Sequence, residues 1–121
     1  MKVYLCGGIN ALSDAAAMGW RAAATRQLRH ETIDPMRRDY RGKESENVAA
    51  IIGEDLDDIA QCDALLVNAF SPSWGTAMEV ALAKRVMNKY VVVWHPPEKP
   101  VSPWLRGHSD VICASLKEST E

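Results

Sequence analysis

Glu79 is a candidate for catalysis because of where it falls on a segment of helical period. Counting 100° per residue from Thr76 places it on the apolar side of that helix, with Met78, Leu82, Ala83 and Val86. The alternative is a capping box, in which Thr76 caps the helix and Glu79 reaches back to the cap amide. A capping glutamate faces water, whereas an inward carboxylate is costly to bury unless it is paired or functional. Both interpretations are open at this point.

Asp55 is a second acid that we expect to point inward. It lies on the apolar stripe of the preceding helical segment, which contains Val48, Ile51, Ile52, Leu56 and Ile59. On that helix Asp57 points to the opposite side, Asp58 sits near the stripe edge, and Glu54 flanks it. Two inward carboxylates near one crevice are the minimum for a nucleophile plus a general acid or base. Chance placement is the alternative.

Short apolar runs rich in β-branched residues alternate with helical segments, which is the pattern of a parallel α/β sheet. We expect strands at 2–6, 31–34, 63–68, 89–94 and 110–113, and helices at 14–29, 46–61 and 75–88, with a short fourth helix after Ser102. Segments 35–45 and 69–74 carry Pro, Gly and Ser and are expected to be loops. The prediction is one domain, residues 1–121, with a flavodoxin- or Rossmann-like open sheet of about five parallel strands and helices on both faces. Ligands of such sheets bind beyond the carboxyl ends of the strands.

Two loops at those strand ends contain candidate binding residues. Gly7 and Gly8 follow the first strand and let backbone amides approach a ligand, although the sequence lacks a full phosphate-loop motif and a tight strand-to-helix turn explains them better. The second loop contains Asp34, Arg37, Arg38, Tyr40 and Arg41. Its arginines either bind a phosphate or line a solvated loop.

The amino-acid composition indicates which class of binding partner to expect. The 121 residues are 47% hydrophobic and carry a net charge of −2, so the chain lacks the basic surplus needed for a nucleic-acid polymer. A small-molecule substrate is favoured. The sequence has no apolar run long enough for a signal peptide or a membrane span, and we expect a cytoplasmic protein. Three cysteines without CxxC spacing and three scattered histidines predict neither disulfides nor a metal site.

Four blocks of the sequence resemble the nucleoside 2-deoxyribosyltransferase family, which includes the deoxynucleoside 5′-monophosphate N-glycosidases. The blocks are residues 2–8 (KVYLCGG), 34–42 (DPMRRDYRG), 54–63 (EDLDDIAQCD) and 73–79 (SWGTAME). The resemblance implies that Glu79, four residues after the helix-start Gly75, is the nucleophile, that Tyr4 orients it, and that Asp55 handles the proton of the base. It implies cleavage of an N-glycosidic bond through a covalent deoxyribosyl intermediate, with transfer to another nucleobase and without a metal or organic cofactor.

At two positions the sequence departs from the transferases. They carry an acid six residues before the nucleophile and an asparagine after the next strand, whereas this chain has Ser73 and Ser102. In the monophosphate glycosidases both positions are serines that receive the 5′-phosphate, the second from a neighbouring subunit. The resemblance therefore leaves transferase and monophosphate hydrolase open, and it implies a homo-oligomer. A cytokinin-type phosphoribohydrolase and a non-catalytic nucleotide-binding module are the alternatives from other classes.

Overall fold

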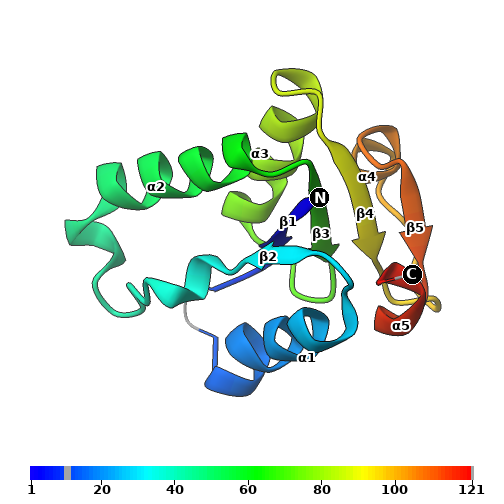
Figure 1. Ribbon diagram of the computed structural model, residues 1–121, viewed down its shortest axis with the longest axis horizontal. Coiled ribbons are helices and arrows are strands. Elements are labelled where there is room, and N and C mark those ends of the chain that lie inside the picture. The colour runs from blue at the N-terminus through cyan, green and yellow to red at the C-terminus, as the bar shows by residue number, and fades with distance from the viewer. Residues whose placement is uncertain (10–11, 121) are drawn as a thin grey trace.

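One sheet of five parallel strands forms the centre of the molecule (Figure 1), a computed structural model that describes residues 1–9 and 12–120. The strands are β1 (Lys2–Cys6), β2 (Glu31–Ile33), β3 (Ala64–Asn68), β4 (Tyr90–Trp94) and β5 (Val111–Cys113). Their order across the sheet is β2-β1-β3-β4-β5. This is the order of flavodoxin-like sheets, and it confirms the predicted fold class. All five predicted strands are present, each within one residue of the expected ends.

Five helices connect or follow the strands: α1 (Trp20–Gln27), α2 (Val48–Gln61), α3 (Trp74–Arg85), α4 (Pro103–Gly107) and α5 (Leu116–Ser119). A π-helical turn, Ala15–Gly19, leads into α1, and Ser13 Oγ accepts a hydrogen bond from the amide of Ala16 at its start. The segment 35–45, expected to be a loop, contains two 3₁₀ turns, Pro35–Arg37 and Glu44–Glu46. Helix α5 was not predicted. Its four residues are too few to show a helical period.

The two faces of the sheet carry different helices. Figure 1 shows α1 and α5 on one side and α2 and α3 on the other. Side chains of β1 alternate between them, as those of a strand must: Val3 and Leu5 pack in the core beside α1, and Tyr4 and Cys6 in the core beside α2 and α3. Because Tyr4 and Cys6 lie on the same face of β1, the face of the sheet that α3 covers carries both a phenol hydroxyl and a thiol.

Two predicted apolar stripes differ from what the structure shows. On α2, Val48 and Ile52 are exposed, and only the later part of the stripe, including Ile59, is buried. Figure 1 shows the first turns of α2 extending away from the strands, so no sheet lies beneath them. On α3, the residues that face the core are Val80 and Ala83, whereas apolar residues four apart on another side are exposed: Trp74, Met78, Leu82 and Val86. Helix α3 is therefore apolar on two sides.

Two tryptophans lie at the starts of helices, one of them in the segment 69–74 that was expected to be a loop. Trp74 is the first residue of α3, and Trp104 is the second residue of α4. Their side chains are 83% and 81% exposed, so both are available for contacts outside the chain. All three cysteines are free and buried. Within residues 1–9 and 12–120, no helix combines the length and the apolar character needed to cross a membrane.

Candidate active site

A cavity of about 330 Å³ opens beside the carboxyl ends of β1 and β3. These strands are neighbours in the sheet, and the strand order reverses between them, which is where ligands bind in open α/β sheets. The cavity has the size of a small-molecule site. Seven residues singled out in the sequence line it: Gly7, Arg38, Tyr40, Asp55, Ser73, Gly75 and Glu79. They come from four separate segments of the chain.

Glu79 reaches this cavity from the second turn of α3, and two donors on β1 hold its carboxylate. The Tyr4 hydroxyl donates to Oε2 over 3.2 Å, and the Cys6 thiol donates to Oε1 over 3.4 Å. Tyr4 and Cys6 are 1% and 0% exposed, so neither donor can turn to water. Burial, followed by the charge of Glu79, raises the pKa of both donors, which therefore keep their protons.

Asp55 lies beside Glu79 and shares a side-chain hydrogen bond with it. Burial and the charge of Asp55 raise the pKa of Glu79 to about 7, and burial also raises the pKa of Asp55. Because the two carboxyls are joined, the value near 7 describes loss of the proton that they share rather than a proton fixed on either one. One nucleophilic carboxylate and one acid thus stand side by side at neutral pH.

Arg38 is the cation nearest to this pair. Its guanidinium contacts Asp55 over 3.4 Å and Asp58 over 2.6 Å, and it also pairs with Glu54. Asp58 is buried and accepts two further hydrogen bonds from Arg37. Burial acts to raise the pKa of Asp58, but the hydrogen bonds from both arginines outweigh it and lower the pKa. These ion pairs attach the 35–45 segment to α2.

Tyr40 lines the cavity beside Arg38, and its hydroxyl donates to Glu54 over 2.8 Å. Arg41 does not line the cavity. Its guanidinium pairs with Asp39 and Asp14 and donates a hydrogen bond to the carbonyl of Leu12. Arg37 likewise lies outside the cavity, against Asp58. Every arginine of this segment therefore has a carboxylate partner, and none presents an unpaired charge for a phosphate among the residues that the structure describes.

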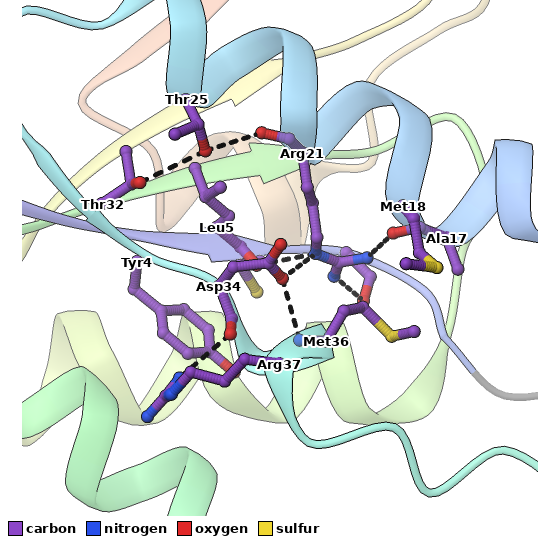
Figure 2. A network of polar contacts seen from close by, with 12 residues as sticks. Tyr4, Leu5, Ala17, Met18, Arg21, Thr25, Thr32, Asp34, Met36 and Arg37 are labelled. Carbon is purple, nitrogen blue, oxygen red and sulfur yellow. Dashed lines mark hydrogen bonds and ion pairs between the residues drawn. The ribbon is translucent and has the colours of Figure 1, made fainter.

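Gly7 and Asp34 both interact with a buried arginine, Arg21, which the sequence analysis did not identify as a site residue. Arg21 of α1 donates to the backbone carbonyls of Leu5, Ala17 and Gly7 and lies 3.6 Å from Asp34 (Figure 2). The Asp34 carboxylate also accepts a hydrogen bond from the backbone amide of Met36. It therefore stabilises the turn behind the cavity. This network fixes the end of β1, where the cavity begins.

Close packing explains the two glycines after β1. A Cβ on Gly7 would come within 2.8 Å of Trp20, and one on Gly8 within 3.2 Å of Leu12 and of the Ser71 carbonyl. The first distance is shorter than real Cβ contacts, so Gly7 must lack a side chain. Packing against Trp20 thus accounts for Gly7, and only Gly7 of the two lines the cavity.

Ser73, and not Thr76, caps α3. Its Oγ accepts the amide of Thr76 over 3.1 Å and donates to the hydroxyl of Thr76 over 2.7 Å. The capping-box interpretation of Glu79 is therefore wrong, because the helix begins earlier and Glu79 points toward Tyr4 and Cys6. Ser73 and Thr76 also line a second cavity of about 530 Å³, which contains Ser102. Ser102 caps α4 by accepting the amide of Trp104, and it lies outside the first cavity.

The sequence did not identify Cys6 and Arg21 as members of the site. A usable signal existed for Cys6, because it lies two residues after Tyr4 and so shares its face of the strand. For Arg21 the signal was its place in an otherwise small and apolar stretch, 15–24, where a charged side chain needs buried partners.

Two solved structures resemble the chain closely in fold. A 2-deoxyribosyltransferase from the psychrotolerant bacterium Bacillus psychrosaccharolyticus has a TM-score of 0.79 at 16% identity, over 100% of this chain and 91% of that one. The CMP N-glycosidase BcmB of Clostridium botulinum has a TM-score of 0.60 at 19% identity, over 98% of this chain and 94% of that one. The chain has the deoxyribosyltransferase fold. In sequence, neither a protein-family model nor a curated protein matches it.

On this deoxyribosyltransferase fold, the carboxyl pair has the parts needed for displacement at a sugar carbon. A carboxylate held by two neutral donors is a nucleophile of fixed orientation, and a neighbouring protonated carboxyl is a general acid. The same pairing of two carboxyl groups operates in glycoside hydrolysis.

Proposed function

We propose that this protein belongs to the nucleoside 2-deoxyribosyltransferase family and cleaves the N-glycosidic bond of 2′-deoxynucleosides, transferring deoxyribose to another nucleobase. One observation carries the proposal. Glu79 is held by Tyr4 and Cys6 at the floor of a cavity, with Asp55 sharing its proton. Three of the four sequence blocks that resemble the family, 2–8, 54–63 and 73–79, contribute these residues.

In the first step, Glu79 attacks C1′ of the deoxyribose and forms an ester as the bond from C1′ to the base nitrogen breaks. The electron pair of that bond leaves with the base, and Asp55 delivers the shared proton to it. Tyr4 holds the attacking carboxylate in place. In the second step a nitrogen of an incoming base attacks C1′, Glu79 is released, and Asp55 takes up the proton of the new base.

The base has two neighbours in this proposal, Arg38 and Tyr40, which line the cavity on the side of Asp55. Gly7, Ser73 and Gly75 border it elsewhere. Gly8, Asp34, Arg37 and Arg41 act on substrate through the segments that they stabilise, since their side chains or backbone pack behind the cavity. Ser102 would reach substrate from the second cavity or from a neighbouring subunit.

A second candidate function is hydrolysis of deoxynucleoside 5′-monophosphates with the same Glu79, Asp55 and Tyr4. It is favoured by the first turn of α3, where Ser73 stands at the wall between the two cavities. A 12-residue helix offers amides and a positive dipole end to an anion there. A neutral serine leaves room for the phosphate, whereas an acid at this position would repel it.

We also propose a cytoplasmic homo-oligomer. The exposed apolar side of α3, formed by Trp74, Met78, Leu82 and Val86, is a large surface for a lone small domain to leave in water. A cytoplasmic location agrees with three buried free cysteines.

The decisive experiment incubates the protein with deoxynucleosides and their 5′-monophosphates, with and without a second base, and measures base release and new nucleoside by chromatography. Transfer to the second base supports the transferase, and release that ignores it supports the hydrolase. Glu79→Ala should lose nearly all turnover, whereas Glu118→Ala, at an exposed position of α5, should retain it. If Glu79→Ala keeps more than about a tenth of the wild-type kcat, Glu79 is not the nucleophile. If no base is released from any substrate, the proposed function fails.

A further inference from the structure

We propose that Cys6 is a positioning residue for Glu79, whose thiol fixes the second carboxylate oxygen and helps to keep the shared proton on Asp55. The inference deepens the proposed function, because it assigns the protonation states that the reaction needs. It stands on the 3.4 Å contact from Cys6 Sγ to Glu79 Oε1 and on the complete burial of the thiol.

The direction of this hydrogen bond follows from what surrounds the thiol. Cys6 is enclosed in the core between β1 and α3, and burial followed by the charge of Glu79 raises its pKa well above the ordinary value. A thiol that keeps its proton can only donate to a carboxylate. Tyr4 does the same at the other oxygen. Both oxygens of Glu79 are therefore acceptors, as they are in an ionised carboxylate.

The location of the proton follows from that count of donors. A hydrogen bond between two carboxyl groups requires that one of them is protonated. The pKa of about 7 and the hydrogen bond from Asp55 favour a proton on Glu79, whereas the donors Tyr4 and Cys6 favour an ionised Glu79. Because both oxygens of Glu79 already accept a hydrogen bond, we place the proton on Asp55, which then donates to Glu79. This arrangement has Glu79 as the ionised nucleophile and Asp55 as the acid for the departing base.

Other charges act on the same pair, and their effects differ. Arg38, at 3.4 Å from Asp55, favours an ionised Asp55 and so opposes the arrangement, whereas Asp58 behind it favours a protonated one. The charge of Arg21 acts on both Cys6 and Glu79 and favours an ionised Glu79. Without the Cys6 thiol, Tyr4 would be the only donor left on Glu79 from β1, and Arg38 would shift the proton toward Glu79.

A thiol suits this task better than a hydroxyl. It is a weak donor, so it orients the carboxylate while leaving the nucleophile basic. Serine at the same place would donate more strongly and lower the basicity of Glu79, and alanine would donate nothing. Cys6→Ala, wild type and Cys6→Ser therefore form a series of increasing donor strength at nearly constant size.

The test measures the carboxyl carbons of Glu79 and Asp55 by ¹³C NMR over a pH series, with Glu79→Gln and Asp55→Asn identifying the two signals. In the wild type, while one proton remains on the pair, Glu79 should have the shift of an ionised carboxylate and Asp55 that of a protonated carboxyl. Cys6→Ala should raise the titration midpoint of Glu79 by about 0.5–1 pH unit, the effect of one ordinary hydrogen bond, and Cys6→Ser should lower it. Cys62→Ala, at a second buried cysteine of the same core, should leave it unchanged.

An infrared spectrum gives a reading that does not require the alanine variant to fold. The S–H stretching band of Cys6, found as the difference between wild type and Cys6→Ser, should move when Glu79 is replaced by Gln. An unmoved band, or a Glu79 titration identical in wild type and Cys6→Ala, overturns the proposal.

Kinetics then links the thiol to the reaction. The acid-side midpoint of the pH profile of kcat/KM should move with the titration midpoint of Glu79. At pH values below this midpoint, Cys6→Ala should have a three- to tenfold lower kcat/KM than wild type, and at higher pH the two values should be equal. Loss of activity equal at all pH values would indicate a packing role and overturn the proposal. If the wild type releases no base, the proposed function fails, and the NMR and infrared results still decide whether Cys6 positions Glu79.

Discussion

Replacing Glu79 by Gln should stabilise the fold at pH 8 while it removes activity. The carboxyl pair loses its shared proton near pH 7, and above that pH two negative charges stand together in a partly buried place. The amide of Gln carries no charge and still accepts a hydrogen bond from Tyr4. The variant thus removes the repulsion between the Glu79 and Asp55 carboxylates, which destabilises the fold of the wild type above pH 7.

The size of this effect follows from the pKa. In the folded protein the carboxyl pair loses its shared proton near pH 7, compared with an ordinary pKa of 4.5 for Glu79, and each pKa unit corresponds to 1.36 kcal/mol. A raised carboxyl pKa means that stability is complete below the ordinary value and falls as pH rises through the folded one. The loss approaches about 3 kcal/mol at pH 8 and stays below about 1 kcal/mol at pH 5. Allowing about 1 kcal/mol for the lost hydrogen bond from Cys6, Glu79→Gln should gain about 2 kcal/mol at pH 8 and nothing at pH 5.

Urea unfolding of wild type and Glu79→Gln at both pH values measures this difference, and thermal unfolding at pH 8 should show a rise of roughly 6–10 °C. Asp57→Asn, which removes an exposed carboxylate of α2, is the control and should change stability little at either pH. A Glu79→Gln variant that is less stable than wild type at pH 8, or whose effect is the same at both pH values, would refute this account of the pair.

Three further outcomes are expected. Asp55→Asn should slow release of natural bases far more than release of leaving groups that need no proton, measured as kcat/KM for both kinds; equal slowing would make Asp55 structural. Ser73→Asp keeps a good helix cap but should weaken a 5′-monophosphate selectively, by about 1–3 kcal/mol or roughly five- to 150-fold in kcat/KM relative to the parent nucleoside; equal losses would favour the plain nucleoside transferase. Sedimentation should show an oligomer that Leu82→Glu dissociates, and an active wild-type monomer would contradict it.

The strands could be predicted because buried parallel strands need continuous apolar runs, and these stand out in the sequence at 2–6, 64–68 and 90–94. The inward direction of Glu79 was also correct, but of the residues expected beside it only Ala83 is buried, while Met78, Leu82 and Val86 are exposed. Helix α3 is apolar on two sides, so hydrophobic periodicity could not tell the side that packs on the sheet from the exposed one. Val80 and Ala83, which do face the core, are smaller than the exposed Trp74, Met78 and Leu82.

Partners of the polar residues could not be predicted, because each joins segments distant in sequence. Cys6 and Glu79 are 73 residues apart, and Arg37 and Asp58 are 21 apart. The sequence of the 35–45 segment shows three arginines, but the carboxylate partners of Arg37 and Arg38 lie on α2. Arg41 pairs with the neighbouring Asp39 and with the distant Asp14. The start of α3, expected at residue 75, lies at Trp74, but the cap could not be chosen from the sequence, because Ser73 and Thr76 are both good caps.

The separation of the two sheet faces also matters for anyone who wishes to improve this protein as a catalyst. The carboxyl pair and its donors all lie on the face that α2 and α3 cover, while Leu5, Trp20, Ala24 and Leu66 form a separate core under α1. Substitutions in that second core can be selected for heat resistance without touching a group that contacts substrate, provided that Arg21 and Gly7 are kept. Variation aimed at new substrates belongs on the opposite face, at the cavity walls. Libraries for the two goals can therefore be built on different residues and combined afterwards, with effects that should add for sites that are far apart.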